Sequence, residues 1–441
     1  MKNRRANEGL RRALVEADWS QTQLAQAVNR IGRESGMALR YDNSAVSHWI
    51  DGTRPRKAVR PLVREALSRR LRRPVTLAEI GFREEVPSGA VDTVEGLVDL
   101  GRIDMDPSRR GVLGAGLFSV ALTIPDWRDV VGRLESVQTG RASRIGWADV
   151  RTVVAMTERI SELDDQFGGR HARPMAASFM VNTVAPYLRA EAPEDVRNGM
   201  LSAASDLCYL TGYMAVDEGL HGLAQRYYLK ALELAGHADD HLTYCTTLRG
   251  MSVQAVDLGH GVQAQRLADA AAAASPQAGQ RMRAFLAGQQ AHAYAQVGDK
   301  SGALRFMAEA ERAMDRAESR EKAFGSYDPA ALNYHLGQIR FELGETEASI
   351  SAMTDALRLL PPIYRRARVR ELSLKAERQL RVGRLEEACA TWHLALDDYP
   401  LVQSGRCDER VREMRALLRP HLANSDARAL YERSRTLGAR A

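Results

Sequence analysis

The chain has 441 residues, of which 45% are hydrophobic and 27% charged, so it can bury a sizeable core divided among two or three domains. This composition excludes an intrinsically disordered chain and a collagen-like fibre. Residues 1–85 hold 18 Lys and Arg against 10 Asp and Glu, whereas the rest of the chain holds 44 against 46. Positive charge confined to one region is typical of a nucleic-acid-binding module, although an arginine-rich solvated surface gives the same count.

The sequence does not predict an exported or membrane-spanning protein, although Arg109-Arg110 before an apolar run superficially resembles a twin-arginine export signal. Residues 1–12 are followed by an amphipathic segment and not by the apolar core of a signal peptide. The longest uncharged run, residues 111–125, is shorter than the ~20 residues that cross a bilayer, so it predicts a short buried helix. The four cysteines are scattered, which predicts reduced thiols. We therefore expect a cytoplasmic protein that does not contact a membrane.

Apolar spacing predicts three helices within the first 50 residues. The first ends near Asp18, and Ser20 caps the second. A polar stretch containing glycine follows, after which Asp42 or Asn43 can cap a short third helix through Trp49.

Two further helices are expected to complete a domain over residues 1–82. One runs over residues 59–71, and Thr76 caps a short last helix whose apolar residues close the core. Residues 83–125 have weak periodicity with several glycines and prolines, so they predict a linker that holds the short apolar helix. The remainder of the chain is expected to be helical, because no stretch alternates apolar and polar residues as a strand does.

Glycines recur every 39 to 46 residues in the second half of the chain, and other positions keep register with them. Five residues after each glycine stands a small residue, and twelve after it stands an alanine. Pairs of antiparallel helices need a glycine at the turn and small residues where the two helices approach. The glycines are Gly219, Gly259, Gly298, Gly344 and Gly383.

This register resembles the tetratricopeptide repeat (TPR), whose usual length is 34 residues, so the units here are extended. The resemblance implies an α-solenoid over residues 201–441, with C-terminal helices. Residues 126–200 look like further helical pairs in which the repeat pattern has decayed.

Two segments of the basic region resemble the helix-turn-helix of the xenobiotic-response-element (XRE) and phage-repressor family. They are residues 20–25, Ser-Gln-Thr-Gln-Leu-Ala, and residues 45–55, Ala-Val-Ser-His-Trp-Ile-Asp-Gly-Thr-Arg-Pro. The segment between them is about ten residues longer than the family pattern, so either the supporting helix is extended or a loop with Arg30, Arg33 and Arg40 bulges. The resulting expectation is an all-α protein, with a five-helix helix-turn-helix domain at residues 1–82 followed by a TPR-like α-solenoid.

The resemblance implies that the third helix enters the major groove of DNA, with Val46 and Trp49 in the core. Asn can pair with adenine, and Ser or His can donate to purines or phosphates, although each of these residues could equally be a cap or a solvated position. The predicted DNA-binding residues are Asn43, Ser44, Ser47 and His48 on this helix, with Gln21, Arg54, Arg56 and Lys57 as backbone contacts.

Residues 163–169, Leu-Asp-Asp-Gln-Phe-Gly-Gly, and Arg109-Arg110 with Gly-Val-Leu resemble segments of actinobacterial regulators that join such a head to TPRs. The architecture is also similar to Gram-positive quorum-sensing receptors, whose TPR body binds a signalling peptide. It implies a groove for a peptide or small molecule; the alternatives are a solvated inner face or a platform for a protein. The candidate ligand-binding residues are Tyr213, Gln254, Gln290, Tyr294, Asn333, Tyr334 and Gln338.

Signals for an enzyme are poor. The glycines of residues 111–116 have the wrong spacing for a dinucleotide loop, and no Walker A or Gly-x-Ser-x-Gly sequence is present. His237 and His241 could share a helix face as metal ligands, but a junction between helices explains them better. We expect no enzymatic activity, no catalytic residue, no cofactor and no metal site.

The sequence therefore predicts a transcriptional regulator that binds specific double-stranded DNA and is controlled by a peptide, small-molecule or protein effector at its TPR-like domain. A homodimer is expected, because one head buries too little surface for tight specific binding. The apolar spacing of Val411, Met414, Leu417 and Leu418 predicts the pairing surface. The alternative function is a TPR scaffold for protein partners with incidental DNA binding.

Overall fold

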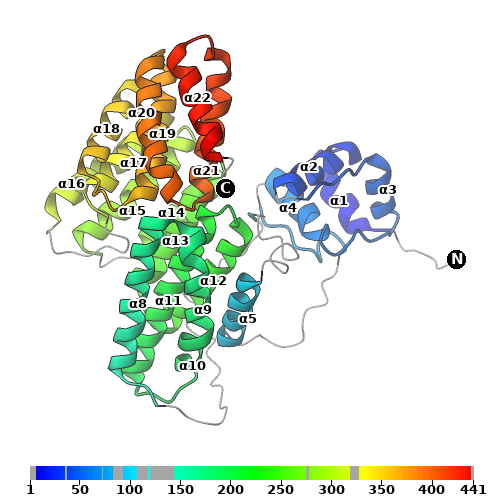
Figure 1. The fold of residues 1–441 in the computed structure, drawn as a ribbon. Coiled ribbons are helices and arrows are strands. Elements are labelled where there is room, and N and C mark those ends of the chain that lie inside the picture. Colours follow the sequence, from blue (N-terminus) through cyan, green and yellow to red (C-terminus); the bar gives the residue numbers. More distant parts are fainter. Residues whose placement is uncertain are drawn as a thin grey trace.

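The computed structural model describes residues 6–34, 37–71, 73–82, 93–106, 118–119, 144–274, 278–317 and 327–438. These residues confirm the all-α class, since they form helices, turns and one isolated bridge between Arg144 and Glu191. None of the helices found there is both long and apolar enough to cross a membrane. Figure 1 displays a small N-terminal head beside a larger helical body.

The head is built from four helices around its own apolar core. They are α1 (Glu8–Glu16), α2 (Gln21–Glu34), α3 (Asn43–Ile50) and α4 (Arg60–Leu71). Asp42 caps α3 by accepting a hydrogen bond from the amide of Ala45 at 3.0 Å. The core extends from Leu10 to Phe82 and includes the buried Val46 and Trp49, as the sequence predicts.

The prediction of a fifth helix in the head is wrong. Thr76 and Glu79 exchange side-chain to backbone hydrogen bonds of 3.1 and 3.3 Å, so the cap forms. The chain then makes only turns, because Gly81 adopts a positive φ of 72° and ends the segment after about one turn. Ile80 and Phe82 are nevertheless buried and close the core.

The long segment between the supporting and recognition helices is accounted for by an extended α2 and a pinned loop. Arg30 and Arg33 lie on α2, and Arg40 lies in the loop that follows. Asn29 fixes this loop, since its side chain donates to the carbonyl of Tyr41 at 2.7 Å and accepts from the amide of Tyr41 at 2.8 Å. The structure thus combines the two alternatives left open by the sequence, with Arg30 and Arg33 on the helix and Arg40 in the loop.

The predicted linker contains a regular helix that belongs to the body. Helix α5 (Thr93–Met105) buries Leu97 and Leu100 in the core of the body. Its Asp104 accepts a hydrogen bond from Tyr227 at 2.9 Å and pairs with Arg173. The short helix predicted over residues 111–125 lies outside the described residues except at Phe118 and Ser119, which are not helical.

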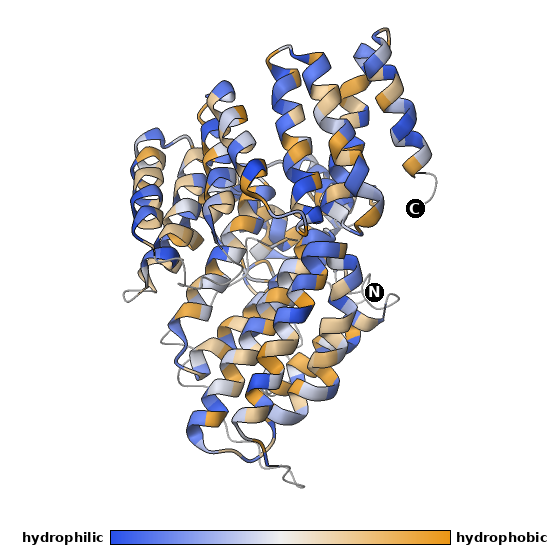
Figure 2. Ribbon diagram, turned by 60° about the vertical axis from the view of Figure 1, so that its left-hand side comes forward, coloured by the Kyte–Doolittle hydropathy of each residue, from blue (hydrophilic) through white to orange (hydrophobic). Residues whose placement is uncertain are grey.

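The body begins with α8 (Trp147–Phe167), α9 (Gly169–Phe179), a π-helical turn η2 (Met180–Val184) and α10 (Ala185–Leu188). Six antiparallel pairs follow, with the short 3-10 segments η3 (Tyr399–Leu401) and η4 (Arg419–His421) near the end. The pairs are α11 (Glu194–Asp217) with α12 (His221–His237), α13 (His241–Asp257) with α14 (Gly261–Ala273), α15 (Gln280–Gln296) with α16 (Lys300–Arg316), α17 (Pro329–Glu342) with α18 (Thr346–Leu359), α19 (Arg365–Arg381) with α20 (Leu385–Asp398), and α21 (Gly405–Leu418) with α22 (Ser425–Gly438). Apolar and polar residues lie side by side along these helices, as amphipathic packing requires (Figure 2).

The five register glycines form the turns of the first five pairs, as predicted. All have φ between 74° and 84°, a left-handed conformation that glycine adopts without a steric penalty. The amide after each glycine donates to the carbonyl five residues earlier at 2.8–3.0 Å, which closes the first helix of the pair. The small residues five and twelve positions later are fully or almost fully buried between the helices.

The apolar residues predicted as a pairing surface for a dimer are largely internal. Val411, Met414 and Leu418 are buried in the C-terminal core, and Leu417 is partly buried against it. The helix that carries them, α21, packs against α19 and α22 of the same chain. The prediction of an exposed pairing surface at this site is therefore wrong.

The end of α8 contacts α19 and the segment before α21, and this contact is here called the closing joint. Arg366 on α19 forms ion pairs of 2.9 Å with Asp164 and Asp165 at the end of α8. Gly168 adopts a φ of 91° and lies so close to Gln403 that a Cβ would be 2.4 Å from its carbonyl oxygen. Residues 163–169, singled out from the sequence, thus join segments roughly two hundred positions apart.

The head contacts the body through Phe118 and Ser119. The Ser119 hydroxyl donates to buried Glu65 on α4 at 2.8 Å, and the Ser119 backbone exchanges hydrogen bonds of 2.9 and 3.1 Å with Gln225 on α12. Phe118 stacks on His260 with ring centroids 4.8 Å apart. This attachment is on the α4 side of the head, whereas α3 lies on the side away from the body (Figure 1).

Candidate nucleic-acid interface

Helix α3 presents a polar outer face and an apolar inner face. Asn43, Ser44 and His48 are exposed, and Ser47 is half-buried. Their side chains make no hydrogen bond to the described residues, so their donors and acceptors are available to a partner. The inner face holds Val46, Trp49 and Ile50, and Tyr41 packs edge-on against Trp49 at 5.1 Å.

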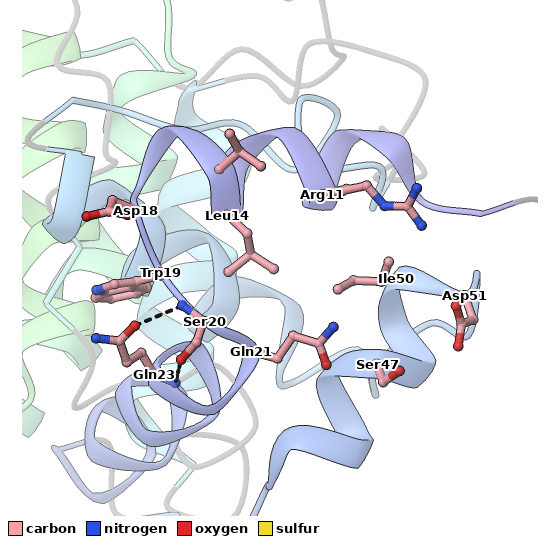
Figure 3. A pocket seen from close by; sticks show the side chains of 11 residues that line it. Arg11, Leu14, Asp18, Trp19, Ser20, Gln21, Gln23, Ser47, Ile50 and Asp51 are labelled. Carbon is pink, nitrogen blue, oxygen red and sulfur yellow. Dashed lines mark hydrogen bonds between the residues drawn. The ribbon is translucent and has the colours of Figure 1, made fainter.

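Gln21 and Ser47, predicted on separate helices, are brought to one hollow of about 660 Å³. Figure 3 places Gln21 at the start of α2 facing Ser47 on α3, with Arg11 of α1 across from them. Ser20 and Gln23 fix this end of α2, since the Ser20 hydroxyl accepts from the Gln23 amide at 3.2 Å and the Gln23 side chain accepts from the Ser20 amide at 2.8 Å. A helix N-terminus with polar side chains around it suits a phosphate group.

Arg54, Arg56 and Lys57 lie exposed in the loop after α3. The loop is held from inside, because Pro55 is buried and its carbonyl accepts a hydrogen bond from Arg60 at 3.0 Å. The first turn of the loop is fixed by the Thr53 amide, which donates to the His48 carbonyl at 2.8 Å. The cations therefore extend from an ordered loop that adjoins the recognition helix.

Two sets of cations in the head differ in their partners. Arg69 pairs with Glu34 at 2.6 Å and Glu65 at 2.8 Å, and Arg73 pairs with Glu16 and Glu79 at 2.8 and 2.7 Å. The hydrogen bond from Arg73 lowers the pKa of Glu79. The second set, called the free cations, lies on α2 and in the loops flanking α3, is exposed, and forms no ion pair with any described residue. It consists of Arg30, Arg33, Arg40, Arg54, Arg56 and Lys57.

Sequence reasoning did not include Arg11 among the candidate DNA-binding residues. Arg11 is exposed and forms only a 3.4 Å pair with Glu8, also exposed, so it can exchange this partner for a phosphate. The Asn7 amide donates to the Ile50 carbonyl at 2.7 Å, and this bond sets the start of α1 beside the end of α3. The periodicity of apolar residues does not predict that α1 and α3 lie next to each other.

Several of the candidate ligand-binding residues of the body are hydrogen-bonded within the chain. Gln290 and Tyr294 both donate to Asp269 on α14, at 2.8 and 3.1 Å, and the side chain of Asn333 donates to the Pro329 carbonyl at 2.8 Å. Gln254 is fully buried and donates to the His221 carbonyl at 3.0 Å.

Tyr213, Tyr334 and Gln338 make up a second group, which lies among arginines of α19. Arg366 is over the Tyr213 ring at 5.2 Å, and Arg370 is over the Tyr334 ring at 5.4 Å. Gln338 donates to the Tyr334 hydroxyl at 3.1 Å and contacts Arg378. Many of the amide and hydroxyl groups expected to hold a ligand are therefore used inside the chain.

The histidines weighed as metal ligands stand at a helix junction, the interpretation favoured by the sequence. His237 ends α12, whereas His241 begins α13. Among the residues that the structure describes, no group of three or more His, Cys, Asp or Glu side chains is arranged to hold a metal ion.

Comparison with known families finds a match to the head. The family model described as the SP15 N-terminal domain matches residues 10–83. This range begins on the first buried residue of α1 and ends just after the core residue Phe82. No curated protein matches the chain.

Proposed function

We propose that the protein is a sequence-specific DNA-binding transcriptional regulator whose head binds DNA through α3. The observation that carries the proposal is the division of charge in the head. Six exposed cations on α2 and in the loops flanking α3 form no ion pair with any described residue, and the outer side chains of α3 are unoccupied. Arg69 of α4 and Arg73 after it are instead paired with carboxylates. Unpaired cations can neutralise phosphates and release their counterions, while exposed polar groups on a helix can read base edges.

The position of the attachment to the body supports this proposal. Phe118 and Ser119 hold the head by α4, so α3 is not covered by the described part of the body (Figure 1). Arg54, Arg56 and Lys57 would contact phosphates, together with Gln21 at the start of α2. Asn43, Ser44, Ser47 and His48 would face the bases, and two heads of a homodimer would occupy adjacent half-sites.

Selection from random-sequence duplex DNA with the full chain tests the proposal. We expect enrichment of one motif, and Asn43→Ala or His48→Ala to relax the selection at individual base pairs at a cost of about 1–3 kcal/mol in discrimination. Failure to enrich any motif would favour the alternative function, a TPR scaffold for protein partners, because a scaffold does not need base readout. Sedimentation of the chain on the selected duplex then tests the homodimer.

The body is proposed to be the sensor that controls the head. A peptide, small molecule or protein bound there would alter DNA affinity if it binds two arrangements of the chain differently. The contact from Gln225 through Ser119 to Glu65 supports this part, because it is a direct physical connection from the repeats to α4.

A further inference from the structure

The first helices of successive pairs bring a cluster of arginines to the inside of the body. Arg249 comes from α13, whereas Arg370 and Arg378 come from α19. They are called the interior arginines. His292 of α15 and His335 of α17 lie among them, with ring centroids 6.5 Å apart.

Arg249 is buried without a carboxylate partner in the described residues. Its guanidinium lies 3.7 Å from the centroid of the Phe285 ring and donates to the Phe285 carbonyl at 3.2 Å. It also donates to Nε2 of His335 at 3.2 Å, so that nitrogen carries no proton. Nδ1 of His335 then donates to the Tyr327 hydroxyl at 3.0 Å, which keeps the imidazole neutral. All these partners are neutral, so the charge of Arg249 is solvated by dipoles and aromatic rings.

Arg378 is likewise buried without forming an ion pair with a described carboxylate. Only 3% of this residue is exposed, and its guanidinium lies 4.6 Å from the centroid of the Phe341 ring and contacts Gln338. Glu377, its neighbour in sequence, is paired with Arg410 at 3.1 Å instead. Burial lowers the pKa of Arg378 to about 10, because the charged form loses its hydration and the attraction of Glu377 and Glu342 does not compensate for that loss.

The third interior arginine has a shared partner. Arg370 lies 3.7 Å from Asp257, and Asp257 also binds Arg406. Burial lowers the pKa of His292 to about 4, and Arg378, Arg370 and Arg249 lower it further against the opposing effect of Asp257. All three interior arginines therefore act on one imidazole, which itself makes no hydrogen bond to the described residues.

Buried charges in proteins are normally paired, since an uncompensated ion costs several kcal/mol of desolvation. We infer that the interior arginines form a binding site for a small anion that carries a carboxylate or phosphate group. Guanidinium groups bind both through paired N–H donors, and the Phe285, Tyr334 and Phe341 rings hold the guanidinium planes in place.

The site also has a route to regulation, which rests on the proposed function. Arg370 and Arg378 stand on α19, the same helix that supplies Arg366 to the closing joint. An anion shared by α13 and α19 ties the middle of the repeat array to its end and favours the closed body. The sequence suggested an effector bound by amide and hydroxyl groups. The structure suggests instead an anionic effector bound by arginines.

Thermal unfolding of the full chain without DNA tests the site. Inorganic phosphate and succinate are the probes, each titrated against chloride at constant ionic strength. We expect at least one of them to raise the Tm by about 3 °C or more in a saturable way, with one anion bound per chain by calorimetry. Which probe acts distinguishes phosphate from carboxylate ligands.

Arg378→Met and Arg249→Met are expected to abolish the shift. Arg305→Met is the matched control, because Arg305 lies over the Phe306 ring at the same 4.6 Å but on the exposed side of α16. Without an anion, Arg378→Met should be at least as stable as the parent, since it removes an unpaired buried charge. If Arg249→Met does not fold, Arg378→Met and Arg370→Met still show whether the Tm shift requires the interior arginines.

The inference is overturned if neither probe shifts the Tm, or if all variants respond like the parent chain. It is also overturned if Arg378→Met lowers the Tm strongly in chloride alone, which would mean that the described neutral partners already stabilise the charge. This experiment contains no DNA, so a negative result would argue against the anion site and not against DNA binding by the head. Conversely, a failure to bind DNA would not affect the Tm shift measured here.

Discussion

The head and the body use charged residues in different ways. In the head, the free cations stand exposed on α2 and in the loops on both sides of α3, and none of them forms an ion pair with a described carboxylate. In the body, Arg173 and Arg366 are buried against carboxylates that come from distant parts of the chain. Exposed unpaired charge is available to a partner, whereas buried paired charge holds one arrangement of the helices.

The largest effect that this comparison predicts is at the closing joint. Arg366→Met would leave the buried Asp164 and Asp217 and the partly buried Asp165 without their shared cation. The free energy of unfolding should therefore fall by about 3–5 kcal/mol in a denaturant titration. Arg358→Met is the control, because its pair with Asp355 is exposed, and a change within about 0.5 kcal/mol is expected. Equal effects from both variants would contradict the account of the joint.

The pH dependence of stability tests the buried charges of the body in a second way. The pKa of His292 is lowered to about 4 by burial and the interior arginines, so between pH 6.5 and 4 the folded state binds fewer protons than the unfolded state. Stability from this group is complete above pH 6.5 and is lost as pH falls towards 4, at up to about 1.4 kcal/mol per pH unit. The parent chain should therefore lose stability relative to His292→Leu as the pH is lowered over this range. A constant difference would mean that His292 is protonated as readily in the folded chain as in the unfolded one.

A smaller effect is expected from a substitution at the contact between the head and the body. Gln225→Leu removes both hydrogen bonds to the Ser119 backbone and should weaken the attachment of the head by about 1–3 kcal/mol. Faster hydrogen exchange at Ser119 and in α4 is the expected readout. Gln263→Leu is the matched control, since Gln263 lines the cleft of about 200 Å³ beside α4 but has no hydrogen bond to the described residues. Unchanged exchange in Gln225→Leu would remove this contact as a connection between body and head.

The smallest effect concerns the repeat turns. Gly259→Ala should lower the free energy of unfolding by about 1 kcal/mol, because its φ of 75° disfavours a side chain although nothing lies within 4 Å. Gly146→Ala has equally open space but an ordinary φ of −139°, so less than half that loss is expected. Similar losses in a thermal or denaturant titration would show that the turn conformation is not the reason for these glycines.

The parts of the fold that local pattern determines could be predicted from the sequence. Helix α3 with its Asp42 cap, and the turns at the five register glycines, depend on residues within a few positions of one another. Gly81 ended the expected fifth helix after one turn, which apolar spacing alone did not indicate.

Contacts between distant residues could not be predicted in this way. Arg366 and Asp165 are 201 positions apart, and no periodicity relates them. The sequence did single out residues 163–169, but only their spatial partners identify them as a joint. The position of Arg11 beside Ser47 and the arginine lining of the interior likewise depend on how helices pack.

The salt dependence of DNA binding tests most directly whether the free cations are the DNA-binding charges. The logarithm of the association constant of the full chain should fall linearly with the logarithm of salt concentration, and Arg54→Ala and Arg56→Ala should each reduce that slope by about 0.9. Arg73→Ala, which removes a cation already paired with Glu16 and Glu79, should leave the slope unchanged. A slope that Arg73→Ala reduces as much as Arg54→Ala does, or that neither free cation alters, would contradict the division of the head into paired and DNA-binding charges.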